Sequence, residues 1–184
     1  MDLNVKHMIQ NQLVRRDIAD KKVLEAIEKV PRHLFVGKVQ RPFAYGDNPL
    51  PIGHGQTISQ PYIVAFMTKM LNVQSHHTVL EIGTGCGYQA AILSLLVKKV
   101  ISLEIVKALA NSTKKRLKKL NYQNIEVFCF NGKKGWVNDA PYDRIITTAA
   151  PTQVPDALIE QLAPNGQMVI PVGPDVNHQC LHII

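Results

Sequence analysis

Apolar residues at helical spacing mark the beginning of the chain. Residues 1–18 place an apolar side chain at roughly every third or fourth position, which predicts an amphipathic helix. Asp20 can cap a second helix with the same spacing, and Pro31 would end it. The first part of the chain is therefore expected to be helical.

The next segment, residues 37–61, loses this spacing. Eight glycines and prolines interrupt it, which predicts a long loop without regular secondary structure. Loops of this length in compact domains are usually functional or disordered. Order is favoured here because the segment also carries apolar residues, namely Phe43, Tyr45, Leu50, Ile52 and Ile58.

From Pro61 onward, short apolar runs alternate with helical patterns. Strands are expected at 78–82, 100–103, 125–128, 142–147 and 167–172. Helices are expected at about 61–71, 88–97 and 155–162, with a basic helix after the second strand. Such alternation produces right-handed crossovers and a mostly parallel sheet. The expected fold class is α/β, a Rossmann-like sheet with helices on both faces and a helical N-terminal extension.

Length and composition fit one domain. The chain has 184 residues, of which 46% are apolar and 19% charged, a balance typical of globular proteins. We expect a single domain over 1–184, with a helical cap and lid in 1–60 and an α/β core in 61–184. The apolar runs are too short for a membrane span, and the first residues do not resemble a signal segment, so a cytoplasmic protein is expected. Three cysteines without a Cys-x-x-Cys pair indicate neither a disulfide framework nor a metal site.

The net charge of +7 comes from one segment. Residues 98–119 contain eight basic residues and one acid, whereas bases and acids cancel over the rest of the chain. The same segment supplies an apolar face, so a solvated helix surface is the favoured interpretation. A groove that binds nucleic acid is the less favoured alternative.

A glycine-rich loop follows the first predicted strand of the core. Gly83, Gly85 and Gly87 would let the backbone approach a ligand at the carboxyl end of the sheet. Glu104 ends the next strand, where a carboxylate can accept from both hydroxyls of a ribose. The spacing is Gly-x-Gly-x-Gly rather than the dinucleotide pattern Gly-x-Gly-x-x-Gly. Together with the short chain, this spacing favours a cofactor with a single nucleoside.

These features resemble the S-adenosylmethionine site of class I methyltransferases. Residues 44–61, AYGDNPLPIGHGQTISQP, resemble the signature of the protein-L-isoaspartate O-methyltransferase family, and residues 79–89, 147–151 and 166–173 are similar to further segments of it. The resemblance implies methyl transfer from S-adenosylmethionine to the free α-carboxyl of isoaspartyl residues in damaged proteins. The ester then collapses to a succinimide, which can reopen to aspartate.

The resemblance also implies the residues of the site. Ser59 corresponds to the active-site residue, and its hydroxyl could hold an oxygen of the acceptor carboxylate. The alternative is a turn or cap before the helix at Pro61. Asp47 could hold the loop closed through hydrogen bonds to loop amides. Cofactor contacts are expected from Gln56, Thr57, Ile58, Ser59, Glu81, Gly83, Thr84, Gly85, Gly87, Tyr88, Glu104, Ile105, Asn131 and Gly132.

Three features depart from the family pattern. Phe130-Asn131-Gly132 stands where Gly-Asp-Gly is usual, so that Phe130 could crowd the cofactor, and two lysines, Lys133 and Lys134, follow. The family pattern also continues through a further strand pair, of which residues 179–184 could supply only the start. The strand at 168–172 is then expected to be an open apolar edge, with low stability or activity unless another chain covers it. An impaired relic of the family and a methyltransferase with another acceptor, such as RNA, are the alternative functions.

Overall fold

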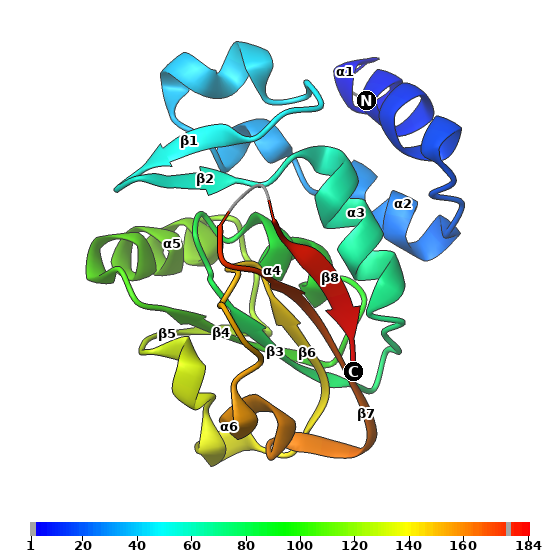
Figure 1. The fold of residues 1–184 in the computed structure, drawn as a ribbon. Helices are drawn as coiled ribbons and strands as arrows, with labels where there is room; N and C mark the ends of the chain where they lie inside the picture. Colours follow the sequence, from blue (N-terminus) through cyan, green and yellow to red (C-terminus); the bar gives the residue numbers. More distant parts are fainter. Residues whose placement is uncertain (1–2, 176–177) are drawn as a thin grey trace.

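The computed structural model describes residues 3–175 and 178–184 and contains one large sheet with the strand order β5-β4-β3-β6-β7-β8 (Figure 1). The first five of these strands are parallel, and β8 is antiparallel to β7. Strand order reverses at β3, because β4 lies on one side of it and β6 on the other. The strands are β3 (Thr78–Ile82), β4 (Lys99–Glu104), β5 (Ile125–Cys129), β6 (Tyr142–Thr147), β7 (Leu162–Val172) and β8 (Cys180–Ile183).

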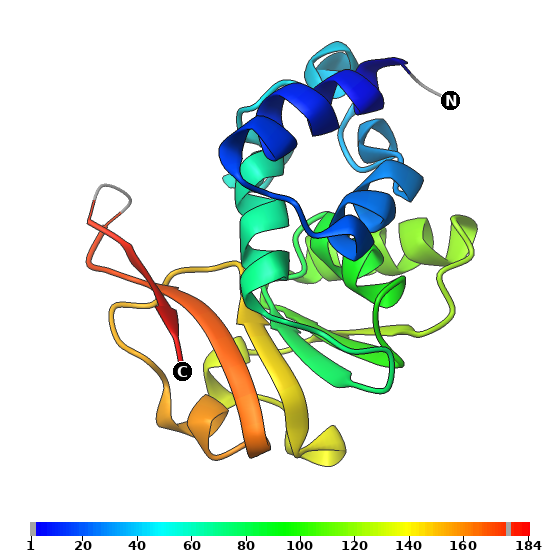
Figure 2. The same ribbon diagram turned by 90° about the vertical axis from the view of Figure 1, so that its right-hand side faces the viewer.

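Both faces of this sheet are covered, as the sequence predicted (Figure 2). Alternate strand residues such as Val79 and Val100 pack beneath α3 (Pro61–Met70) and α4 (Tyr88–Ser94). On the same side, α5 (Lys107–Lys119) packs its apolar face against β5. The intervening residues, such as Leu80, face the short helix α6 (Asp156–Ile159).

The N-terminal segment is helical but less regular than predicted. Helix α1 (Leu3–Met8) continues as a π-helical turn to Leu13 and a 3-10 turn that ends at Arg16. Residues 1–2 of the predicted helix lie outside the described part. Of the apolar side chains in this segment, Leu13 is buried, whereas Val14 is exposed.

The second helix begins directly after Asp20, the capping residue that the sequence predicted. The Asp20 carboxylate accepts from the backbone N–H groups of Lys22 and Val23 at 3.0 and 3.2 Å, and α2 extends over Lys21–Lys29. Among residues 3–175 and 178–184, no helix combines the length and the hydropathy required to cross a bilayer.

The prediction that residues 37–61 lack regular structure is wrong. A 3-10 helix covers Lys38–Phe43, and β1 (Leu50–Gly53) and β2 (Gln56–Ile58) form an antiparallel hairpin. Leu50 and Ile58 lie opposite each other and are both buried. The turn between the strands has positive φ at three consecutive residues, 53–55, a conformation that its two glycines adopt without strain. Closely spaced glycines therefore indicated a tight turn rather than an irregular loop.

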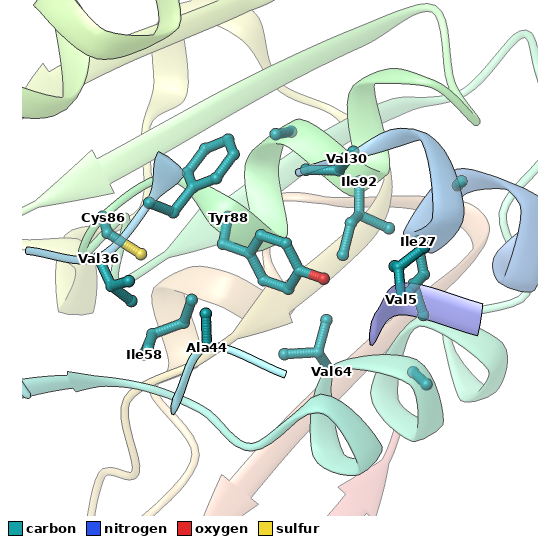
Figure 3. Packing of buried hydrophobic residues seen from close by; sticks show 14 of the residues in the cluster. Val5, Ile27, Val30, Val36, Ala44, Ile58, Val64, Cys86, Tyr88 and Ile92 are labelled. Atoms are coloured by element: carbon teal, nitrogen blue, oxygen red, sulfur yellow. The ribbon is translucent and has the colours of Figure 1, made fainter. Parts of the chain in front are cut away.

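One large apolar cluster joins the N-terminal segment to the core. Tyr88 of α4 lies at its centre, and Figure 3 shows Ala44, Ile58 and Val64 around its ring. The ring of Phe35 meets Tyr88 edge-on, with 5.4 Å between the centroids. The hairpin and the N-terminal helices are thus packed directly on the helix that follows the glycine-rich loop.

The expectation of an open apolar edge at 168–172 is also wrong. Strand β8 pairs with β7 from Val169 opposite Ile183 to Val172 opposite Cys180. Val169 and Ile170 are fully buried, and the side chains of β8 are exposed. Residues 180–183 therefore pair with the backbone groups at the end of β7, which an open edge would leave without partners.

The predicted helices at 88–97 and 155–162 are shorter than expected, because α4 ends at Ser94 and α6 at Ile159.

Candidate active site

The predicted site residues meet at the carboxyl ends of β3 and β4, next to the point where strand order reverses. A cavity of about 350 Å³ lies there, a volume within the range of small-ligand sites. A smaller cavity adjoins it beside α3 and α4. Except for Glu81 and Gly87, every predicted cofactor residue lines one of the two cavities: Gln56, Thr57, Ile58, Ser59, Gly83, Thr84, Gly85, Tyr88, Glu104, Ile105, Asn131 and Gly132.

The glycine-rich loop is held from both sides. Gly83 has φ +97°, and a Cβ there would collide with Thr148, whose hydroxyl donates to the Gly83 carbonyl at 2.6 Å. From α5, the Thr113 hydroxyl donates to the Gly85 carbonyl at 2.7 Å, and Arg116 Nη1 donates to the Cys86 carbonyl at 3.0 Å. Arg116, one of the eight bases in residues 98–119, therefore stabilises this loop and is not simply part of a solvated helix surface.

Glu104 connects the loop to the end of β4. Its Oε2 accepts from the Gly85 N–H at 2.8 Å, and its Oε1 accepts from the Val106 N–H at 2.9 Å. The side chain is buried yet lines the larger cavity. Because a carboxylate has about four acceptor positions, Glu104 can still accept from hydroxyls of a ligand.

Glu81 lies behind the loop and is fully buried. The Ser102 hydroxyl donates to its Oε2, and Ser102 also contacts the Thr84 hydroxyl at 2.6 Å. Burial raises the pKa of Glu81 to about 8; the Glu104 charge adds to the rise, and the hydrogen bond from Ser102 opposes it. Its Oε1 has no hydrogen-bond partner within the described part of the chain. Glu81 lines neither cavity, so a cation bound in the site would act on this carboxyl through space and favour its ionised form.

Replacing Glu81 by Gln is expected to flatten the pH dependence of stability in the absence of ligand. The carboxyl keeps its proton up to about pH 8 when folded, against an ordinary pKa of 4.5. Between these values the folded state binds more protons than the unfolded chain. The free energy of unfolding should therefore fall as pH rises through this window and level off above it. The total decrease in the free energy of unfolding across this window is a few kcal/mol, since one pKa unit corresponds to about 1.36 kcal/mol.

Urea unfolding of both proteins at about pH 5 and about pH 8 measures this difference. The Glu81→Gln variant keeps an acceptor for Ser102 and removes the ionisation. It should lose less stability than the unsubstituted protein between the two pH values. Equal losses would show that Glu81 does not titrate in this window.

Ser59 lies between the hairpin and α3. It lines both cavities, and its side chain is half-buried. The residue at the cap position of α3 is Gln60, and its side chain makes no capping hydrogen bond. The alternative role of Ser59 as the helix cap therefore does not hold.

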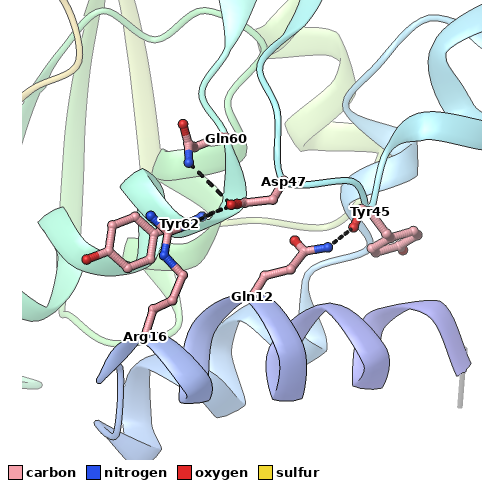
Figure 4. Close-up of polar contacts among 6 residues, drawn as sticks. All are labelled: Gln12, Arg16, Tyr45, Asp47, Gln60 and Tyr62. Carbon is pink, nitrogen blue, oxygen red and sulfur yellow. Dashed lines mark hydrogen bonds and ion pairs between the residues drawn. The ribbon is translucent and has the colours of Figure 1, made fainter.

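Asp47 connects residues 44–49 to the N-terminal helical segment and to α3, and not to backbone amides of its own loop as expected. Its carboxylate accepts from Arg16 Nη1 at 2.6 Å and from the Tyr62 backbone N–H at 3.4 Å (Figure 4). The Arg16 guanidinium also lies 3.6 Å from the centroid of the Tyr62 ring. Nearby, Gln12 donates to the Tyr45 carbonyl at 2.8 Å. The N-terminal helix therefore braces the segment that precedes the hairpin.

The departures from the family pattern are accommodated. Phe130 does not line the cavity, and its ring packs edge-on against Trp136 with 5.3 Å between the centroids. Asn131 lines the cavity and accepts from the Lys133 N–H at 3.1 Å, while Lys133 is exposed at the cavity edge.

Among the described residues there is no group of three or more metal-ligating side chains.

Sequence reasoning missed Arg32. Its side chain is fully buried and donates to the Ala44 and Ser59 carbonyls, both at 2.7 Å. An arginine within the largely apolar run around Phe35 is a sequence feature that could have indicated a buried charge, but nothing in the sequence indicated what it contacts.

A mostly parallel sheet with a Gly-x-Gly-x-Gly loop after its central strand, and a buried acid at the end of the next strand, is typical of a class I S-adenosylmethionine-dependent methyltransferase. Within this class, residues 3–184 match the family model for "Protein-L-isoaspartate(D-aspartate) O-methyltransferase (PCMT)". The chain belongs to this family.

Individual relatives agree with this assignment. The chain is 54% identical over 168 residues to the protein-L-isoaspartate O-methyltransferase of Synechococcus sp., covering 91% of this chain and 69% of that protein. It is 49% identical over 179 residues to that of Opitutus terrae, covering 97% and 77%. A crystal structure of a putative Plasmodium falciparum member in complex with S-adenosyl-L-homocysteine has a TM-score of 0.84 at 27% identity, covering 100% of this chain and 90% of that one. By its family, the chain is an S-adenosylmethionine-dependent protein carboxyl methyltransferase.

Proposed function

We propose that the chain methylates the free carboxyl of L-isoaspartyl residues in damaged proteins at the cavity beneath the β1–β2 hairpin, and that Ser59 holds the acceptor. The position of Ser59 carries this proposal. Its side chain lines both cavities at the carboxyl edge of the sheet, beside the glycine-rich loop. A hydroxyl at that place can donate to one carboxylate oxygen and leave the other free to react.

The residues around the larger cavity fit S-adenosylmethionine. Glu104 would accept from the ribose hydroxyls, and Asn131 from the adenine amino group. Buried Glu81 lines neither cavity, so it would act on the cationic amino group through its charge rather than by direct contact, and the bound cation would favour the ionised form of this carboxyl. When bound, S-adenosylmethionine supplies a methyl group activated by a positively charged sulfonium.

The chain has no need of a general base for this reaction. Carboxyl groups ionise near pH 4, so the acceptor is already a nucleophile at neutral pH. What remains for the protein is to align the acceptor and to exclude water. The hairpin suits this task because Thr57 and Ser59 reach both cavities.

The other parts of the chain are assigned roles on the same basis. Residues 1–60 would act as cap and lid, and residues 61–184 as the cofactor-binding core. Isoaspartyl-containing proteins and peptides would be its partners. The three cysteines, Cys86, Cys129 and Cys180, are all unpaired, which supports a reducing compartment such as the cytoplasm.

Transfer of a labelled methyl group from S-adenosylmethionine to an isoaspartyl peptide tests the proposal. The matched control is the same peptide with a normal aspartyl residue. Label should appear in the isoaspartyl peptide alone. Label in neither peptide, from a protein that still binds S-adenosylhomocysteine, would indicate another acceptor, and loss of that binding as well would indicate an impaired relic.

A further inference from the structure

Arg32 is a buried cation without an acidic partner. Its side chain has no exposed surface, and none of the ion pairs among the described residues includes it. Burial lowers its pKa, and neighbouring Tyr88, whose ring centroid lies 4.9 Å from the guanidinium carbon, opposes the shift. A buried charge is unfavourable unless hydrogen bonds compensate it, so the contacts of this guanidinium identify its role.

Those contacts connect the two ends of the segment that carries the hairpin. Nε donates to the Ala44 carbonyl and Nη2 to the Ser59 carbonyl, each at 2.7 Å. Ala44 precedes β1, and Ser59 is the residue immediately after β2. Ser59 therefore lies beyond the paired residues of the hairpin, and the hydrogen bond from Arg32 fixes its peptide group in place of a strand partner.

The third nitrogen of the guanidinium is not satisfied. Nη1 is buried and has no hydrogen-bond partner among the described residues. A buried donor left unpaired is destabilising, and most such donors in proteins are paired. An apolar side chain of similar volume would avoid this penalty, but it would leave the Ala44 and Ser59 carbonyls without their donor, so the arginine is explained by the two peptide groups that it holds.

We propose that Arg32 is a positioning residue for methyl transfer, which holds the peptide group of Ser59 so that the hydroxyl faces the acceptor carboxylate. This inference rests on the proposed role of Ser59. The positive charge also lies one hydrogen bond from that residue. In a partly desolvated site, a cation at this position favours binding of an anionic acceptor.

Two substitutions separate the geometric effect from the charge. Arg32→Lys keeps the charge but cannot donate to both carbonyls in the planar arrangement of a guanidinium. It should lower kcat for an isoaspartyl peptide by about 10- to 100-fold, the effect expected of a misplacement near 1 Å. Arg32→Gln also removes the charge and should raise KM for the peptide further. Both variants should bind S-adenosylhomocysteine within about threefold of the unsubstituted protein, because Arg32 makes no hydrogen bond to the glycine-rich loop.

Arg144→Lys is the matched control. Arg144 also donates to backbone carbonyls, those of Leu71, Asn72 and Asp143, but it lies outside both cavities. Its substitution should leave kcat unchanged. Rates are expressed per S-adenosylhomocysteine-binding site, so that unfolded material does not imitate a catalytic defect. The neutral Arg32→Gln variant has no charge to bury, and it reports on the same hydrogen bonds if Arg32→Lys does not fold.

A double-mutant cycle with Ser59→Ala decides whether Arg32 acts through Ser59. If it does, Arg32→Lys should change kcat by less than about threefold once the hydroxyl is gone. An undiminished effect in that background would overturn the inference. An impaired Ser59→Ala with an unimpaired Arg32→Lys would overturn the inference alone, whereas full activity of Ser59→Ala would refute the proposed role of Ser59 itself.

Discussion

Replacing Ser59 by alanine should lower kcat/KM for an isoaspartyl peptide by about 10- to 150-fold. A hydrogen bond to a charged group contributes about 1.5–3 kcal/mol, and each 1.4 kcal/mol corresponds to a factor of ten. The affinity for S-adenosylhomocysteine should stay nearly unchanged, because the larger cavity is built chiefly from the glycine-rich loop and the ends of β3 and β4. Steady-state methyl transfer together with calorimetric titration separates the two quantities.

Ser112→Ala is the control for this substitution. The Ser112 hydroxyl donates to the Leu109 carbonyl on α5, and the residue lines neither cavity. Ser59→Thr should recover part of the activity because it restores a hydroxyl. Activity of Ser59→Ala within about twofold of the unsubstituted protein would show that the hydroxyl does not hold the acceptor in the rate-determining state.

Replacing Glu104 by alanine should weaken binding of S-adenosylhomocysteine by about 100-fold or more. The carboxylate accepts from the Gly85 and Val106 N–H groups, and its removal frees the loop in addition to deleting the proposed ribose contacts. Two charged hydrogen bonds correspond to about 3–6 kcal/mol if their contributions add. Isothermal titration calorimetry measures the loss directly.

The Glu104→Gln variant should bind S-adenosylhomocysteine with an affinity between those of Glu104→Ala and the unsubstituted protein. It keeps one oxygen acceptor but introduces an N–H donor where an acceptor is needed. Glu25→Ala, at an exposed position of α2, is the matched control and should not alter cofactor affinity. An unchanged affinity of Glu104→Ala would exclude this carboxylate from the cofactor site.

Much of the core could be predicted from the sequence because its strands are buried on both faces. Such strands appear as continuous apolar runs, and the runs at Val79 and Ile145 are recognisable without any alignment. The capping role of Asp20 was equally accessible, since it depends on residues only two and three positions away. The glycine-rich loop and Glu104 follow from the geometry of parallel strands, whose carboxyl ends lie at one edge.

The lid was less predictable because its structure depends on distant contacts. The β1–β2 hairpin is short, and its pairing is supported by burial of Leu50 and Ile58 in a cluster that includes Tyr88. Arg32 reaches across 27 residues to Ser59, and Asp47 across 31 residues to Arg16. No local pattern specifies such partners. The pairing of β8 with β7 was missed for a different reason, because its partners are near in the sequence, with Val172 opposite Cys180. Residues 179–184 were expected to supply only the start of a further strand pair and not to cover β7.

The anchoring of the glycine-rich loop has a thermodynamic consequence for cofactor binding. Thr148, Thr113 and Arg116 donate to its carbonyls and Glu104 accepts from its Gly85 N–H, so groups of the protein itself hold this backbone. The conformational entropy of ordering this loop is therefore lost during folding rather than during association. Cofactor contacts consequently translate into affinity with little loss to ordering, and the backbone that surrounds the ligand is preorganised.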